Sequence, residues 1–265
     1  MKIVTWNMRR ATKKSVAWDY LDKIDPDVAF LQEVNSVPES ITTKFSFHSL
    51  PAVSKYGNVQ KFHTVILSKL PFVDDVELSS TIAWVNDARD FFKGNIIAKS
   101  IEVNNQKLNL VNAYSPAWIV PDDFTAGVDV TGVKLQQNPD VWATEILWKC
   151  LLDHPLIDSE SWLVGGDLNS SETFDYQRKN RPRGNLEIIE RMNALGLYEA
   201  LRTHHACLVP THKNNRGGKI IHQLDHFYMS KHLLDVMKDC QTGSHEDVFD
   251  SKLSDHLPII CSIDV

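Results

Sequence analysis

The chain has 265 residues, 43% of them hydrophobic and 23% charged, a composition typical of a soluble globular protein. Its formal net charge of -6 excludes a surface that coats nucleic acid all over, although it is compatible with a local basic cleft. The length fits one large domain over residues 1–265, and neither an internal repeat nor a linker divides it.

The sequence gives little sign of export or of a membrane. We recognise no signal peptide and no apolar run long enough to cross a bilayer. The four cysteines are scattered without a Cys-x-x-Cys pair, which is typical of free thiols in a reducing compartment. We therefore expect a cytoplasmic protein without stable membrane association, and no obligate protein partner is evident.

The first two predicted strands are each followed by a polar residue that could bind a metal. Residues 3–6 form an apolar strand that ends at Asn7, and residues 28–31 form another that leads to Glu33. The helix predicted between them is stopped by Pro26, because proline forces the preceding residue out of the helical region. Two such strands indicate a site built along one edge of a sheet.

The following part of the chain is predicted to be rich in strands with short connections. The expected strands cover residues 45–50, 62–67, 96–103 and 107–114. Asn104 and Asn105 between the last two are typical of a hairpin turn, and the short connections favour a largely antiparallel arrangement. Residues 117–137 lack clear periodicity and are predicted to form a long loop, a kind of segment that is often functional.

The C-terminal half is predicted to alternate between helices and strands. Asn138 and Pro139 indicate a helix start, as N-cap and first helical residue, and Gly196 indicates the end of a helix near residue 195. This second helix is expected to begin near residue 186. The expected strands cover residues 162–164, 220–229 and 259–263.

The stretch over residues 162–169, Trp-Leu-Val-Gly-Gly-Asp-Leu-Asn, carries the clearest chemical signal. Gly165 and Gly166 remove side chains where the strand ends, so another backbone or a ligand can approach closely. Asp167 and Asn169 follow two residues apart, and they point to one side if strand geometry persists. Together they could bind a cation or a phosphoryl group, whereas the alternative is an Asx turn that closes a loop.

Several polar residues share a place at or near the end of a predicted apolar strand, or within one. They are Asn7, Glu33, Asp167, Asn169, Asp225, Asp255 and His256. Each has a structural alternative, such as a turn residue for Asn7 or a hydrogen-bonded core group for Asp225. Buried carboxylates are costly unless they are paired or bound to metal, so their joint occurrence favours a common site.

These residues stand in short motifs that follow one another along the chain. The motifs are Thr5-Trp6-Asn7, Leu31-Gln32-Glu33, Asn112-Ala113-Tyr114, Gly166-Asp167-Leu168-Asn169, Leu224-Asp225-His226 and Ser254-Asp255-His256. In this order they resemble the endonuclease/exonuclease/phosphatase superfamily, which includes deoxyribonuclease I and the exonuclease III type of apurinic endonuclease. The resemblance implies an α/β fold, a four-layered sandwich of two packed mixed β-sheets flanked by helices.

The resemblance also implies metal-assisted hydrolysis of a phosphoester, with Mg²⁺ or Mn²⁺ as the cofactor. Glu33 would be the main metal ligand, with Asn7 and Asp255 nearby in the metal shell. Asp167 would orient or deprotonate the attacking water, and Asn169 would donate to a phosphoryl oxygen.

A His–Asp couple and a tyrosine complete the residues that the resemblance implies. Asp225 would fix the tautomer of His256 and support a cationic imidazole beside the phosphate. Tyr114 falls where apurinic endonucleases also carry a tyrosine, as a phosphate or leaving-group contact. The chain departs from these enzymes at His222 and His226, on either side of Asp225, which argues against a lesion pocket of the apurinic type.

Three loops expected around the site are rich in basic residues. They contain Arg9, Arg10, Lys13 and Lys14; Arg178, Lys179, Arg181 and Arg183; and Lys213, Arg216 and Lys219. Solvated loop charge is the alternative, but cations near a helix N-terminus are mildly unfavourable, so the first group favours a phosphate-rich ligand. We expect substrate binding by Arg9, Arg178, Lys179, Arg181 and Arg183.

The leading hypothesis is a Mg²⁺-dependent phosphodiester hydrolase, a nuclease that acts on DNA or RNA. The alternative within the same superfamily is a phosphatase or phospholipase C-type hydrolase of inositol phosphates, sphingomyelin or another small phosphoester. The absence of an apolar membrane segment speaks against a lipid substrate. A third hypothesis, a catalytically inactive binding module on this fold, is disfavoured by the intact set of candidate site residues.

Overall fold

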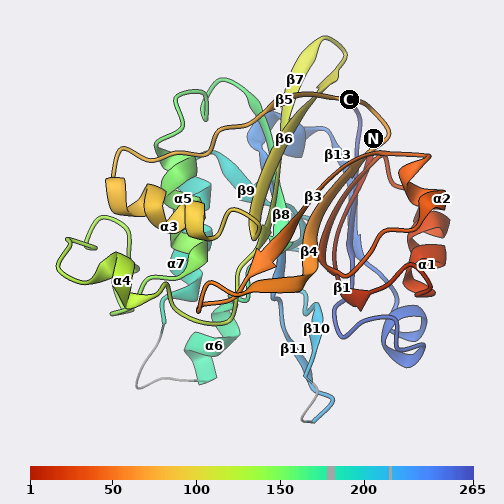
Figure 1. Ribbon diagram of the computed structural model, residues 1–265. Coiled ribbons are helices and arrows are strands. Elements are labelled where there is room, and N and C mark those ends of the chain that lie inside the picture. The colour runs from red at the N-terminus through yellow and green to blue at the C-terminus, as the bar shows by residue number, and fades with distance from the viewer. Residues whose placement is uncertain (178–182, 215–216) are drawn as a thin grey trace.

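The computed structural model describes residues 1–177, 183–214 and 217–265. Two six-stranded sheets pack face to face in this part of the chain, with helices on their outer faces (Figure 1). The strand order of the first sheet is β13 (Met237–Thr242), β14 (Ile259–Ile263), β1 (Lys2–Ala11), β2 (Val28–Val34), β4 (Val59–Ser68) and β3 (Ser46–Val53). That of the second is β5 (Phe72–Asp75), β6 (Ile96–Val103), β7 (Gln106–Tyr114), β8 (Ser161–Asp167), β12 (Asp225–Ser230) and β9 (Leu197–Glu199).

Each sheet has one parallel pair at its centre, β1 with β2 and β7 with β8, whereas the other pairs are antiparallel. Both sheets are therefore mixed, and the predicted fold class is confirmed. Parallel neighbours need a crossover, and here each crossover carries a helix. α1 (Ala17–Ile24) lies between β1 and β2, and α5 (Ala143–Leu152) lies between β7 and β8.

The helices divide between the two outer faces (Figure 1). α1 and α2 (Glu39–Thr42) lie beside the first sheet, and α3 (Ala83–Phe91), α5 and α7 (Asn185–Ala194) lie beside the second. The shorter helical segments are α4 (Asp122–Thr125), α6 (Glu172–Gln177), α8 (Ala200–His205), α9 (Lys231–Asp235) and a helical turn over Glu246–Asp250. No helix among the described residues is long and apolar enough to cross a membrane.

The apolar side chains form three cores, one between the sheets and one under each helical layer. Phe30 and Phe227 meet between the sheets with ring centroids 5.9 Å apart, and Trp162 belongs to the core under α5 and α7. Because β8 is buried on both faces, its sequence opens with the continuous apolar run over residues 162–164 rather than with an alternating pattern.

Buried amides also connect the two sheets. Gln32 Nε2 donates to Asn112 Oδ1 at 2.7 Å, and Asn112 Nδ2 donates to the carbonyl oxygens of Leu31 and Val65. Gln32 and Asn112 have no measurable exposure to solvent, so these hydrogen bonds satisfy groups that water cannot reach. They fix the position of β2 in one sheet relative to β7 in the other.

The predicted strands are present, with shifted ends. The first one continues past Asn7 to Ala11, because Arg9 and Arg10 adopt positive φ angles and form an irregularity in the pairing with β2. Asn104 and Asn105 also have positive φ, 50° and 61°, and they form the two-residue hairpin turn that the sequence predicts.

Two boundaries in the C-terminal half are wrong. The helix expected from Asn138 begins at Ala143, because the Asn138 side chain instead accepts a hydrogen bond from the backbone N–H of Asp140 in an Asx turn. The strand expected over residues 220–229 is divided into β11 (Ile220–His222) and β12, and β11 pairs with β10 (His212–Lys213) rather than with the large sheet. The segment 117–137 is largely loop and turn, and it contains α4.

Candidate active site

The candidate site lies where the two parallel pairs end. Asn7 of β1 and Glu33 of β2 belong to one sheet, and Tyr114 of β7 and Asp167 of β8 belong to the other. Tyr114 and Asp167 are register partners, and Asp225 on β12 is the partner of Asp167 on its other side. The C-terminal ends of parallel strands meet at the same edge of a sheet, so the sequence places these side chains together.

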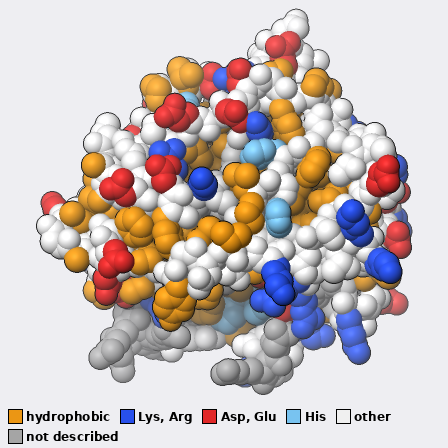
Figure 2. Space-filling model, viewed as in Figure 1, with side chains coloured by type: hydrophobic (Ala, Val, Ile, Leu, Met, Phe, Trp, Pro, Cys, Tyr) orange, Lys and Arg blue, Asp and Glu red, His pale blue; other side chains and the backbone are white. Residues whose placement is uncertain are grey.

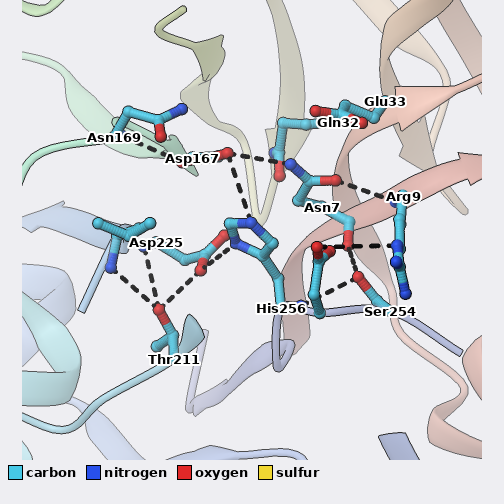
Figure 3. Close-up of polar contacts among 12 residues, drawn as sticks. Asn7, Arg9, Gln32, Glu33, Asp167, Asn169, Thr211, Asp225, Ser254 and His256 are labelled. Atoms are coloured by element: carbon cyan, nitrogen blue, oxygen red, sulfur yellow. Dashed lines mark hydrogen bonds and ion pairs between the residues drawn. The ribbon is translucent and has the colours of Figure 1, made fainter. Parts of the chain in front are cut away.

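His256 forms the centre of the site, between the carboxylates of Asp225 and Asp167 (Figure 3). Its Nδ1 lies 2.9 Å from Asp225 Oδ2, and its Nε2 lies 3.9 Å from Asp167 Oδ2. Trp6 Nε1 donates to the backbone carbonyl of His256 at 2.9 Å, and Ser254 Oγ accepts its backbone N–H. The ring is thus positioned from both sides and from its own backbone.

Asp167 is held by contacts from two other residues. Asn7 Nδ2 donates to its Oδ2 at 2.9 Å, and the backbone N–H of Asn169 donates to its Oδ1 at 3.0 Å. The second contact is the Asx turn that we considered as an alternative, so Asp167 both closes a turn and faces His256. Strand geometry does not persist beyond it, because Asn169 has a φ of 48° and its side-chain amide donates to the Ser115 carbonyl.

Burial and opposing charges set the protonation of this group. Burial alone lowers the pKa of His256, but the charges of Asp225 and Asp167 outweigh this effect and raise the pKa to about 10. Burial raises the pKa of Asp167 well above its usual value, and the cation at His256 only partly opposes this rise. At neutral pH the imidazole is therefore cationic, and Asp167 is more basic than an ordinary carboxylate.

Tyr114 lies at the same edge and remains protonated. Burial and the nearby charges of Glu33 and Asp167 raise the pKa of its hydroxyl far above the usual value. Its ring packs edge-on against Phe62, with centroids 5.4 Å apart. This arrangement offers a neutral O–H donor beside the carboxylates.

The two expected carboxylate metal ligands are partly open to solvent and each faces an arginine. Arg10 Nε lies 4.0 Å from Glu33 Oε2, and Arg9 Nε lies 3.7 Å from Asp255 Oδ2. Asn7 Oδ1 accepts the backbone N–H of Arg9 at 3.0 Å. The oxygen donors and the negative charge of this pair of carboxylates suit a hard cation. The two arginines contact the carboxylates only loosely and partly balance their charge.

Another group of three potential metal ligands lies deeper. Asp167, Asp225 and His256 each offer a ligand atom within 4.8 Å of the others, and this is the only such group of His, Cys, Asp and Glu in the part of the chain that the structure describes. Glu33 and Asp255 do not form such a group among the same residues. Asp225 Oδ2 is already bonded to His256 Nδ1 and Thr211 Oγ1, so a metal that took this oxygen would compete with both contacts.

The basic residues expected to bind substrate are only partly placed. The side chains of Arg9 and Arg10 are 49% and 69% exposed beside the site, and Figure 2 shows Lys and Arg side chains gathered on the side of β1 and β10. The Arg183 guanidinium lies 4.9 Å from the centre of the Trp142 ring. Arg178, Lys179 and Arg181 lie outside the described residues.

Two neighbours of the His–Asp couple were not predicted from the sequence. Thr211 Oγ1 donates to Asp225 Oδ2 at 2.7 Å and accepts the backbone N–H groups of Leu224 and Asp225. The His212 ring lies 4.7 Å from that of His256, and burial together with the charge of His256 lowers the pKa of His212 to about 4. No motif marks either residue, because their positions depend on the short β10–β11 pair.

Residues 4–256 match the model of the Endonuclease/Exonuclease/phosphatase family, so the chain belongs to this family and is a phosphoester hydrolase. Similar solved structures include an AP endonuclease from Archaeoglobus fulgidus, with 17% identity, a TM-score of 0.69 and full coverage of both chains. A 3'-5' exonuclease from Neisseria meningitidis has 16% identity, a TM-score of 0.63 and full coverage of both chains. An AP endonuclease from Leishmania major has 17% identity and a TM-score of 0.67, with 100% of this chain and 87% of that chain covered. A comparison with curated proteins found no match.

Proposed function

We propose that the protein is a divalent-metal-dependent nuclease that hydrolyses phosphodiester bonds of DNA or RNA. The observation that carries this proposal is the buried cationic His256 between Asp225 and Asp167, at a sheet edge where Glu33 and Asp255 add further oxygen donors. A fixed positive charge next to a basic carboxylate is what attack of water on a phosphate ester requires.

The chain's own residues can divide the chemistry among them. Asp167, with its raised pKa, orients the attacking water and takes a proton from it. His256 stabilises the charge that develops on the phosphoryl oxygens, and Asp225 keeps the imidazole oriented and charged. Tyr114 donates its O–H to the phosphate or the leaving oxygen, and the side-chain amide of Asn169 has a second N–H for the substrate.

Glu33, Asp255 and Asn7 would hold the metal, because their oxygens lie at the partly open side of the site. Mg²⁺ or Mn²⁺ bound there would supply Lewis-acid stabilisation of the phosphoryl group. The described residues favour this position over the deeper group, since Asp225 Oδ2 is already hydrogen-bonded to both His256 and Thr211.

A nucleic acid is favoured over a small phosphoester by the exposed cations next to the site. Besides Arg9 and Arg10, the region near Glu33 contains a cavity lined by Arg10, Lys61, Gln60 and Phe62. The Arg10 guanidinium lies 5.7 Å from the centre of the buried Phe62 ring, which helps to position it. Exposed cations beside the site suit a polymer with regularly spaced phosphates.

One substrate panel tests the proposal. Plasmid DNA, single strands, abasic duplex, RNA, inositol phosphates and sphingomyelin are each incubated with Mg²⁺ or Mn²⁺ and with EDTA. We expect metal-dependent cleavage of at least one nucleic acid, lost in His256→Ala and kept in His204→Ala, which removes an exposed histidine. Turnover of only the small phosphoesters would replace the nuclease proposal with the phosphatase alternative, and turnover in EDTA would reject the metal.

A further inference from the structure

Two of the four cysteines face each other in the first sheet, outside the candidate active site. Cys240 on β13 and Cys261 on β14 are direct partners in the antiparallel register, and their sulfur atoms lie 2.7 Å apart. Directly opposite residues of antiparallel strands have Cα atoms about 4.5 or 5.5 Å apart, and a disulfide spans about 4.4–6.8 Å. The backbone therefore already has the separation that a bond between these two sulfurs needs.

Packing alone does not account for this arrangement. A free cysteine behaves as a small hydrophobic side chain, which explains the burial of Cys150 in the core under α5 and α7. Cys240 and Cys261 are also completely buried, but in addition each presents its sulfur to the other. Cys207, the fourth cysteine, is exposed. The fold thus pairs two particular thiols, although the four cysteines are scattered along the sequence.

The strand that carries Cys240 has little other apolar anchorage. β13 lies at the edge of the first sheet, and Cys240 is its only buried residue, because all the others are partly or fully exposed. Segments with few buried apolar contacts open more readily than the core of a protein. Local opening of β13 would therefore expose Cys240 to a small oxidant, and a covalent link would add most where the noncovalent packing is thin.

We propose that Cys240 and Cys261 are a site of reversible oxidation, at which a disulfide fastens β13 to β14. The thiolate of Cys240 attacks a low-molecular-weight disulfide, such as glutathione disulfide, and releases one small thiol. The thiolate of Cys261 then attacks the Cys240 sulfur of this mixed disulfide and releases the second small thiol. The two cysteines together lose two electrons and two protons, which the two small thiols gain.

The closed strand protects the pair, and the link would stabilise the strand that leads out of the site. Burial raises the pKa of the Cys261 thiol, so exchange needs the open strand. β14 begins shortly after His256 and pairs with β1, which carries Asn7. A disulfide mainly restricts the unfolded chain, so the oxidised protein should resist unfolding more than the reduced one.

Mass spectrometry after oxidation tests the link directly. The reduced protein is incubated with glutathione disulfide, either folded or during refolding from urea, the remaining thiols are alkylated, and the nonreduced tryptic peptides are analysed. The four cysteines fall into four different tryptic peptides, so each pairing has its own mass. We expect the peptides of Cys240 and Cys261 to be joined in both samples. A link that forms only on refolding would overturn its formation through an opening of β13.

The unfolding midpoint in urea tests what the link does. The midpoint of the oxidised wild type should exceed that of the reduced protein by about 1 M, as closure of a loop of this length gives. Cys240→Ala and Cys261→Ala should abolish this difference, whereas Cys207→Ala, the matched control at an exposed cysteine, should keep it. A bond between Cys207 and Cys240, mixed disulfides with glutathione alone, or equal midpoints of the oxidised and reduced wild type would overturn the inference.

Discussion

The charge of His256 depends on two carboxylates that the other sheet supplies, and this dependence predicts a pH profile. The value of kcat/KM should fall at acid pH as Asp167 takes up a proton, and at alkaline pH as His256 loses one near pH 10. Asp225→Asn removes the largest contribution that raises the pKa of His256, so the alkaline limb should move to lower pH. A limb that stays in place would exclude His256 as the group that titrates there.

The same histidine should make stability depend on pH. Its pKa rises from 6.5 to about 10 on folding, so its contribution is complete below pH 6.5 and is lost as the pH rises through 10. The free energy of unfolding in urea should therefore decline between pH 6.5 and 10 more steeply in the wild type than in His256→Gln. Equal declines in the two proteins would contradict the raised pKa.

Glu33 is the residue on which we expect the metal to depend most. Glu33→Gln keeps the size of the side chain, removes its charge and should lower kcat by about a hundredfold or more, as loss of a metal ligand does. The thermal midpoint should change little, because the side chain is partly exposed and packs against no core. Glu39→Gln, at the exposed start of α2, should leave the activity intact, and a similar loss in both variants would argue against a special role for Glu33.

Single residues differ in how far the sequence reveals them. Asp167, Asp225 and His256 follow or interrupt apolar runs, where an ionisable group needs a partner, and the structure brings them together. Thr211 gives no such signal, because a threonine near a strand is ordinary and its contact with Asp225 spans 14 residues.

At the scale of elements, Gly166 is what allows β7 and β8 to lie parallel at the site. A Cβ built there would lie 1.8 Å from the carbonyl oxygen of Ala113, and the residue has a φ of 152°. Gly166→Ala should therefore destabilise the fold by about 3 kcal/mol or more, or prevent folding altogether. Gly132→Ala, where a Cβ meets nothing within 4 Å, should change the unfolding midpoint in urea little. Similar unfolding midpoints for the two variants would show that the β7 backbone can move to accommodate the added methyl group.

The elements themselves were largely predictable because their signals are local. Apolar runs mark the strands, and Asn104 and Asn105 mark a hairpin turn. The local signal gave the wrong helix start at Asn138, because the Asn138 side chain forms an Asx turn with Asp140 instead of capping a helix. The parallel pairing of β1 with β2 and of β7 with β8 could not be derived from such signals, because pairing between distant segments depends on packing.

At the scale of the whole molecule, an acidic protein is proposed to bind an acidic polymer through a few basic loops. Replacing Arg178, Lys179, Arg181 and Arg183 by Ser should raise KM for an oligonucleotide and flatten its salt dependence, by up to about 0.9 in slope for each lost phosphate contact. The value of kcat should change little, because such contacts bind ground and transition states alike.

The matched control replaces Lys44, Lys107, Lys231 and Lys238, exposed or partly exposed residues near the opposite ends of the strands. If the salt dependence of KM flattened equally in this control, net charge rather than the loop would govern binding.

The substrate class is what the sequence leaves least determined. The resemblance covers the strands and the candidate site residues at their ends, whereas the loops around the site carry no motif that names a substrate.

The buried amides between the sheets have a consequence for how the enzyme becomes active. A slip of one residue between the sheets would take from Asn112 its partners Gln32, Leu31 and Val65, at about 1–3 kcal/mol for each orphaned group. Gln32 would keep its contacts with Thr5 and Phe30 within its own sheet. These hydrogen bonds therefore favour one alignment, the one that also brings Asn7 of the first sheet, and His256 just before β14, against Asp167 of the second sheet. We therefore expect a chain whose sheets have not yet docked in register to hold every candidate catalytic residue and yet to be inactive.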